Sequence, residues 1–332
     1  MTETPLELSI KNLQALNRLN DPSIPMSQNI LILGAGELGL CVLEGMASHP
    51  KRQHQRITVL MRQATLDSAA PEKRKLIQHI QSLNAGFQAG DVAAASVDDL
   101  AAIFAKYDVV VSCTGMALPS DVQFKILDAA IASGIKRFFP WQFGMDYDAI
   151  GRGTSQGLFD KQVEARDRLR AQNDVDWTIV STGLFMSFLF RADFGVVDLS
   201  QKIVRGLGSW ETEITLTTPP DIGRVAAELI LDPRGIGSRP VYIAGDTFTY
   251  GRLADLLDSH FNTKFKRELW DFEILTKQAQ DEPDNEMIKY RYSFAQGRGV
   301  AWPKEGTFNA ERGIELTDVK TYLEKMDFKV GE

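Results

Sequence analysis

The chain has 332 residues, of which 44% are apolar and 24% are charged, and its formal net charge at pH 7 is −7. These values are typical of a soluble globular protein with one large α/β domain or a cofactor domain and a smaller partner, and they exclude a disordered or fibrous chain. The negative charge argues against a nucleic-acid-binding surface.

Cysteines, histidines and apolar runs exclude further classes. The two cysteines, Cys41 and Cys113, form no CxxC pair, and the four histidines are scattered without the spacing of metal ligands. We therefore expect no disulfide framework, no metal and a reducing compartment, the cytoplasm. No stretch approaches the roughly 18 consecutive apolar residues of a membrane span, so we expect no membrane partner. Residues 1–25 lack the apolar block of a secretory signal and are interpreted as an N-terminal extension.

Strand and helix patterns alternate through the first half of the chain. Short apolar runs predict strands, and amphipathic stretches between them predict helices. The predicted strands are 30–33, 57–61, 87–89, 108–112, 137–140 and 176–181, and the predicted helices are 38–47, 71–83, 97–107, 120–132 and 158–172. Because buried strands separated by helices indicate a parallel sheet covered on both faces, we predict an α/β fold with a doubly wound parallel (Rossmann) sheet over residues 26–182.

The alternation of predicted strands and helices is interrupted at two places. Residues 144–157 contain four glycines and no apolar period, which predicts a long loop where such sheets bind ligands. From residue 183 the chain is more aromatic and less regular, and we predict that 183–332 is mainly a smaller α+β substrate-binding region, with some elements packing back on the first domain. Its predicted strands are 202–204, 213–217 and 241–244, and its predicted helices are 220–231, 250–261 and 317–326.

A glycine turn follows the first predicted strand. Gly34, Gly36 and Gly39 have the GxGxxG spacing of a dinucleotide-binding turn, with Glu37 and Leu38 between the last two glycines. The first glycine permits a tight reversal, the second lets backbone N–H groups approach a pyrophosphate, and the third lets the next helix lie close to the strand. We expect all five residues to contact the cofactor at the helix N-terminus.

The second predicted strand indicates which nicotinamide cofactor is bound. An NAD site usually has an acidic residue near this strand's end, yet no acid occurs between Glu44 and Asp67. Arg62 follows the strand instead, and Lys73 begins a Lys-Arg-Lys run in the next helix. These cations favour the 2′-phosphate of NADP, whereas the alternative is a solvated basic surface.

Residues from about 29 to 260 resemble the isoflavone reductase and phenylcoumaran benzylic ether reductase group, NmrA-like members of the atypical short-chain dehydrogenases. The matching stretches are VLMR at 59–62, GDVAAASVDDL at 90–100, GIKRFFPWQFGMD at 134–146, DWTIVSTGLF at 176–185 and DIGRVAAELILDP at 221–233. The resemblance implies a Rossmann fold, NADPH as cofactor and reduction of a small aromatic or phenolic substrate.

The resemblance also implies roles for individual residues. Arg62 and Lys73 match family residues that bind the 2′-phosphate, Phe143 matches a residue near the nicotinamide, and Lys161 matches the catalytic lysine. At 141–142 the chain has Trp-Gln where Ser-Glu is usual. This departure leaves open an alternative function, an NADP-binding redox sensor without turnover.

Lys161 can be interpreted from physical chemistry alone. A lysine behind a glycine-rich loop and near nicotinamide is expected to be partly desolvated, which would let it exchange a proton near neutral pH. The Tyr-x-x-x-Lys pair of standard short-chain dehydrogenases is absent, because position 157 is Gly. A GxSxG match at 153–157 lacks the preceding strand of a hydrolase nucleophile elbow, so we reject hydrolysis.

We therefore expect an NADPH-dependent reductase with Lys161 as general acid or base. Thr114 and Gly115, after the fourth strand, are expected to border the nicotinamide, and the substrate pocket is expected to include Trp141, Phe185 and Phe188. The sequence leaves open whether the chain forms a homodimer.

Overall fold

The computed structural model describes residues 27–115, 118–326 and 328. The expected extension, residues 1–25, lies outside the described residues. The centre of the structure is a seven-stranded sheet with the order β11-β6-β5-β4-β1-β2-β3, in which all neighbouring strands are parallel. Its strands are β1 (Asn29–Leu33), β2 (Arg56–Met61), β3 (Ala85–Ala89), β4 (Val109–Ser112), β5 (Arg137–Phe139), β6 (Asp176–Ser181) and β11 (Arg239–Tyr242). This architecture confirms the predicted doubly wound fold.

The strand order reverses between β1 and β4. After β1 the chain builds outward through β2 and β3, then returns to place β4, β5 and β6 on the other side. Leu33 is paired in register with Leu60 on one side and with Ser112 on the other. The carboxyl ends of β1 and β4 therefore flank the crevice in which doubly wound sheets bind ligands.

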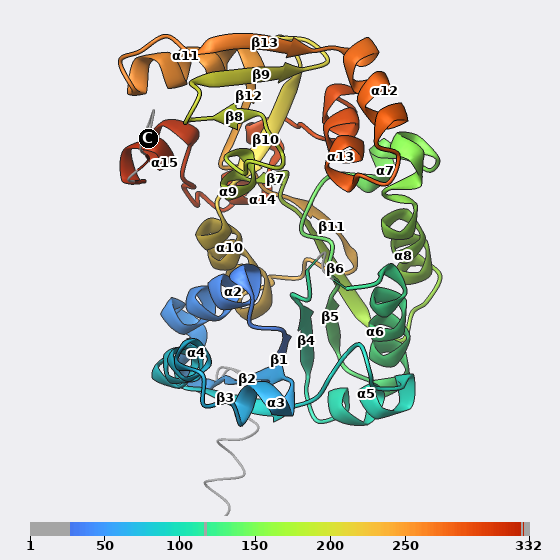
Figure 1. Ribbon diagram of the computed structural model, residues 1–332. Helices are drawn as coiled ribbons and strands as arrows, with labels where there is room; N and C mark the ends of the chain where they lie inside the picture. Colours follow the sequence, from blue (N-terminus) through green and yellow to red (C-terminus); the bar gives the residue numbers. More distant parts are fainter. Residues whose placement is uncertain (1–26, 116–117, 327, 329–332) are drawn as a thin grey trace, which may run out of the picture.

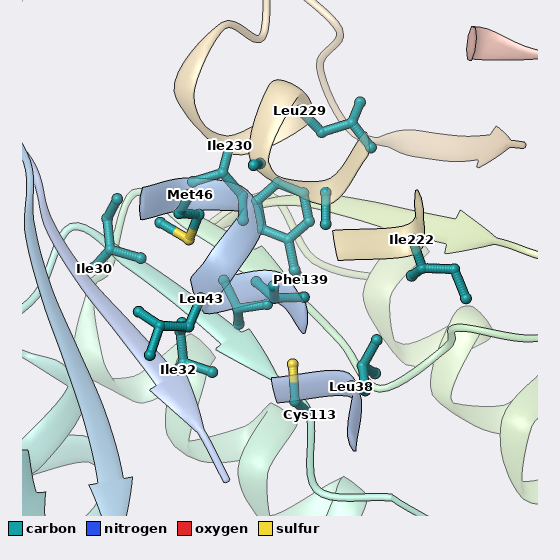
Figure 2. Packing of buried hydrophobic residues seen from close by; sticks show 14 of the residues in the cluster. Ile30, Ile32, Leu38, Leu43, Met46, Cys113, Phe139, Ile222, Leu229 and Ile230 are labelled. Carbon is teal, nitrogen blue, oxygen red and sulfur yellow. The ribbon is translucent and has the colours of Figure 1, made fainter. Parts of the chain in front are cut away.

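Helices cover both faces of this sheet (Figure 1). The helices of the first half are α2 (Glu37–Ser48), α3 (Gln63–Leu66), α4 (Pro71–Ser82), α5 (Val97–Phe104), α6 (Ser120–Ser133), α7 (Tyr147–Ile150) and α8 (Asp160–Arg170), with 3₁₀ turns η1 (Pro50–His54) and η2 (Thr154–Gly157). One face of the sheet packs on α2, and the core there is formed by Ile30, Ile32, Leu43, Met46 and Phe139 (Figure 2). The opposite face packs on α5, α6 and α8.

A helix from the second half completes the first face. The helix α10 (Pro219–Leu231) packs against α2, and the two backbones touch at glycines. A Cβ on Gly223 would lie 2.0 Å from the carbonyl oxygen of Cys41, and a Cβ on Gly45 would lie 2.4 Å from that of Gly223. The close crossing therefore requires glycine at both positions, and it ties the second half of the chain to the sheet.

The rest of the second half forms a separate apolar core with two small sheets, at the top of Figure 1. One sheet has the order β12-β10-β7 and the other β13-β9-β8. The strands are β7 (Leu184–Phe185), β8 (Val197–Asp198), β9 (Ile203–Leu207), β10 (Glu213–Thr217), β12 (Asp246–Thr249) and β13 (Lys266–Trp270). The helices are α9 (Met186–Leu189), α11 (Tyr250–His260), α12 (Phe272–Asp281), α13 (Glu286–Ala295), α14 (Phe308–Glu311) and α15 (Val319–Lys325), with the turn η3 (Lys304–Gly306). Among the described residues, no helix is long and apolar enough to cross a membrane.

The segment predicted as one long loop contains two short helical turns, α7 and η2, so that prediction was wrong in part. Asp146 nucleates α7, because its carboxylate accepts hydrogen bonds from the backbone N–H groups of Asp148 and Ala149 at 3.2 and 3.3 Å. The segment packs against α8 and α13. A short helical turn that is stabilised by one capping residue and by tertiary packing shows no helical periodicity of apolar residues. The sequence pattern therefore did not predict it.

Candidate functional site

The geometry of the turn requires glycine at Gly34 and Gly39. Gly34 has φ +96°, which favours glycine, and a Cβ on Gly39 would lie 2.2 Å from the carbonyl oxygen of Gly34. Gly36 precedes α2, and a Cβ there would meet no atom within 4 Å. The side chain of Leu38 is buried, and Glu37 accepts a hydrogen bond from Ser187 Oγ at 3.2 Å. The turn therefore presents open backbone at the N-terminus of a twelve-residue helix.

A cavity of about 380 Å³ lies beside this turn, between the ends of β1, β2 and β3. Arg62, directly after β2, and Lys73, in the first turn of α4, both line it. Both side chains are exposed, and neither forms an ion pair with another described residue. The structure thus brings together the two cations that the sequence assigned to a 2′-phosphate.

Asp91 was not predicted as a site residue, although it lies in the GDV stretch used for the family resemblance. It lines the same cavity, and its carboxylate accepts hydrogen bonds from the backbone N–H groups of Ala93 and Ala94 at 2.9 and 3.3 Å. These bonds fix the loop after β3, which forms one wall. An Asx-type turn of this kind can be predicted from the sequence as a loop, but the sequence does not show that the loop lines a cavity.

A second cavity, of about 390 Å³, adjoins the first, and Thr114 and Leu118 line both. Its lining includes Gly115, Trp141 and Lys161. Four predicted site residues therefore line the same cavity: Thr114, Gly115, Trp141 and Lys161.

Three predicted residues lie elsewhere: Phe143, Phe185 and Phe188 are not among the residues that line the second cavity. Phe143 is 7% exposed in the core between the sheet and α2, and Phe185 packs on the same core. Phe188 lies against Phe194 and Tyr290, at ring-centroid distances of 5.1 and 6.0 Å. The aromatic lining comes from Trp141, which was predicted, from Phe159, and from Tyr290 of α13. Sequence reasoning missed α13 because its apolar residues do not form a clean stripe.

Tyr290 joins the two halves of the molecule at this cavity. Its ring meets that of Phe159 edge-on at 5.3 Å. Burial, followed by the neighbouring Tyr147 and Glu286, raises the pKa of Tyr290 well above its usual value. The phenol is therefore neutral at physiological pH, and its ring serves as an apolar wall with a polar edge.

Lys161 lies in the first turn of α8. Its side chain is 53% exposed, its ammonium lies 3.3 Å from a carboxylate oxygen of Glu164, and it sits 5.2 Å from the centre of the Phe124 ring. Hydrogen bonds from Arg168 and then from Lys161 lower the pKa of Glu164. In the protein without cofactor the ammonium is ion-paired and half exposed, so the partial desolvation expected beside a nicotinamide stays a prediction.

The helix that carries Lys161 is held by a buried arginine, Arg166. The Arg166 side chain is fully buried, and all five of its N–H donors have acceptors. Nε donates to Gln142 Oε1 at 3.0 Å, one terminal nitrogen donates to Asp146 and Asp148 at 3.2 and 2.8 Å, and the other donates to the Met145 carbonyl and Ser181 Oγ at 3.2 and 3.3 Å. One side chain thus links α8 to the loop after β5 and to the end of β6.

The positive charge of Arg166 is balanced by the carboxylates of Asp146 and Asp148. Hydrogen bonding from Arg170, opposed by partial burial and reinforced by Arg166, lowers the pKa of Asp148 to about 2. Gln142 belongs to this network, since it is 1% exposed and also hydrogen-bonds Gln162. Of the two unusual residues at 141–142, only Trp141 therefore lines the cavity.

Comparisons with known proteins agree with this architecture. The model of the NmrA-like family matches residues 26–302. An NmrA-like family domain-containing oxidoreductase from Gibberella moniliformis is 54% identical over 91% of this chain and 99% of its own. The phenylcoumaran benzylic ether reductase Betv6 of Betula pendula is 26% identical over 90% of this chain and 98% of its own. The solved structure of AtPrR2 with NADP⁺ and (+)-pinoresinol superposes with a TM-score of 0.66 at 19% identity, over 82% of this chain and 87% of that chain.

Replacing Arg166 by Met is expected to destabilise the protein by about 3–5 kcal/mol, because it leaves Asp146 and Asp148 without their buried partner. Arg168→Met on the same helix is the matched control: this side chain is 40% exposed, so its loss should cost at most about 1 kcal/mol. Urea unfolding of the purified variants measures both values. Equal stability losses for the two substitutions would contradict the role given to Arg166.

Proposed function

We propose that this chain, which belongs to the NmrA-like family and is an oxidoreductase, uses NADPH to reduce a small aromatic or phenolic molecule. The observation that carries the proposal is the junction of the two cavities at Thr114 and Leu118. A dinucleotide whose phosphates lie at the glycine turn can extend across this junction, from Arg62 at one end to Lys161 at the other. The crevice between β1 and β4 is where doubly wound sheets bind such cofactors.

The residues around the first cavity fit a nucleotide that carries a 2′-phosphate. Arg62 offers a planar fork of donors and Lys73 a compact charge, and both groups bind phosphate oxygens well. The open space at Gly36 lets backbone N–H groups approach a pyrophosphate. NADPH supplies a hydride when it is bound. The NADP⁺ in the AtPrR2 complex supports this choice.

Lys161 is the residue to which we assign proton transfer. It lines the second cavity, and an ammonium there can donate a proton to the substrate atom that gains negative charge during reduction. Glu164 orients the ammonium through its 3.3 Å contact. Trp141, Phe159 and Tyr290 give the cavity an aromatic wall suited to a ring-shaped substrate. The phenylcoumaran benzylic ether reductase relative supports a substrate of this class.

The alternative function is a redox sensor that binds NADP without turnover, and it rests on the Trp-Gln sequence at 141–142. The position of Gln142 argues against this alternative, because its side chain supports the buried Arg166 instead of facing the cavity. Trp141 lines the same cavity as Lys161. We therefore favour a reductase whose substrate range is narrowed by Trp141.

The cofactor assignment predicts that the chain binds NADPH more tightly than NADH. Arg62→Gln should weaken NADPH binding about 10- to 100-fold, the value of a lost charge-assisted hydrogen bond, and should change NADH binding little. Fluorescence titration measures both affinities. Arg74→Gln is the control, because Arg74 is exposed on the same surface without lining the cavity. Equal affinities of the parent for the two cofactors would refute the assignment.

The reductase proposal predicts NADPH oxidation with some member of a panel of aromatic aldehydes, ketones and phenolic ethers, followed by absorbance. Lys161→Ala should lower kcat by about 100-fold or more with NADPH binding unchanged, because general acid catalysis is lost. Lys136→Ala is the matched control, since this lysine is 64% exposed and ion-paired with Asp108 and lines neither cavity. Tight NADPH binding with no turnover across the panel would favour the sensor, and full activity in Lys161→Ala would remove the role of Lys161.

A further inference from the structure

A second lysine, Lys289 of α13, also lines the Lys161 cavity. It lies at a boundary, because it lines in addition a third cavity of about 440 Å³ between α12, α13 and the turn at Gly153 and Thr154. The third cavity has polar side chains in its lining, among them Gln280, Tyr292 and Gln296. A group bound in the Lys161 cavity can therefore meet Lys289 at the boundary with the third cavity.

Among the described residues, Lys289 has no close ion-pair partner. Its side chain is half-buried, yet it forms no ion pair with any other residue in the described part of the chain. Glu286, one helical turn earlier, lines the Lys161 cavity as well, but it is exposed and more than 4 Å from the Lys289 ammonium. A partly desolvated ammonium without a counter-ion gains more from an incoming anion than a fully solvated one does.

Lys289 differs in this respect from the charged residues of another hollow, the groove between α2 and α10. There His49 pairs with Glu228 at 2.9 Å and Lys51 with Asp232 at 2.8 Å, so these side chains already have partners. An anion arriving in that groove would have to displace a carboxylate. Lys289 requires no such displacement.

We propose that Lys289 binds a carboxylate of the substrate, so that this chain acts on aromatic carboxylic acids in preference to their neutral analogues. The proposal rests on the proposed reductase function and narrows its substrate class. The aromatic ring packs among Trp141 and Tyr290, and the acid group is neutralised by Lys289 at the boundary of the two cavities. Lys161 still donates the proton to the substrate atom that gains negative charge during reduction, so the two lysines have separate roles.

The test compares 4-formylbenzoate with its methyl ester, which has the same ring and aldehyde but no charge. Isothermal titration with NADP⁺ present measures binding without requiring turnover. The parent should bind the acid about 10- to 100-fold more tightly than the ester, the value of one charge-assisted hydrogen bond. Lys289→Gln should bind both compounds with similar affinity, whereas Lys289→Arg should retain the preference.

Two further variants separate recognition of the charge from general damage. Lys277→Gln on the neighbouring helix is the matched control, because Lys277 is 74% exposed and paired with Asp281 at 2.7 Å; it should keep the parent's preference. Glu286→Gln removes the nearby negative charge and should tighten binding of the acid while leaving the ester unchanged.

Failure of this proposal is distinguishable from failure of the reductase function. If the parent binds acid and ester equally, fails to bind the acid, or keeps its preference in Lys289→Gln, the role of Lys289 is overturned, whatever the turnover. If binding is selective and depends on Lys289 while NADPH is never oxidised, the anion site stands and the reductase proposal falls. Should Lys289→Gln not fold, the Lys289→Arg and Glu286→Gln titrations still decide, because loss of acid preference in the first or weaker acid binding in the second contradicts the proposal.

Discussion

The buried side chain of Arg166 is the constraint on which the second cavity depends. A guanidinium with no exposed surface is costly unless every donor is satisfied and the charge is balanced, and here five hydrogen bonds and two carboxylates meet both conditions. Its partners come from the loop after β5, from α7 and from the end of β6, so these segments and α8 are held as one unit. Trp141 and Lys161 are carried by that unit, which fixes where an aromatic wall and an ammonium face the crevice.

Topology supplies the other half of the site. The reversal of strand order between β1 and β4 opens a crevice whose walls are the glycine turn on one side and Thr114 on the other. The α2–α10 glycine contact brings the second half of the chain onto the sheet, and α13 reaches the crevice with Tyr290 and Lys289. The chain thus combines a cofactor crevice with a wall to which Trp141 and the C-terminal helix α13 both contribute, and we assign substrate choice to that wall.

The sequence predicted the sheet and the glycine turn because both follow from local rules. Buried parallel strands are continuous apolar runs, and a GxGxxG turn needs glycine at each position for its own geometric reason. The Arg166 network could not be predicted, because its five acceptors are spread between residues 142 and 181 and only folding brings them together. For the same reason Gln142 was interpreted as a change in the site, whereas it supports a helix. The apolar residues of α13 show little helical periodicity, so this stretch was not predicted as a helix.

A crystal structure of the complex with NADP⁺ tests most directly the claim that the Arg166-held unit places Lys161 beside the reacting end of the cofactor. We predict that the 2′-phosphate lies within hydrogen-bond distance, about 3 Å, of Arg62 and Lys73, and that the nicotinamide ring lies in the cavity lined by Trp141 and Lys161. We also predict that Lys161 Nζ lies close enough to a group stacked on the ring to transfer a proton directly or through one water. A nicotinamide that points away from α8, with Lys161 beyond the reach of one bridging water, would contradict the account.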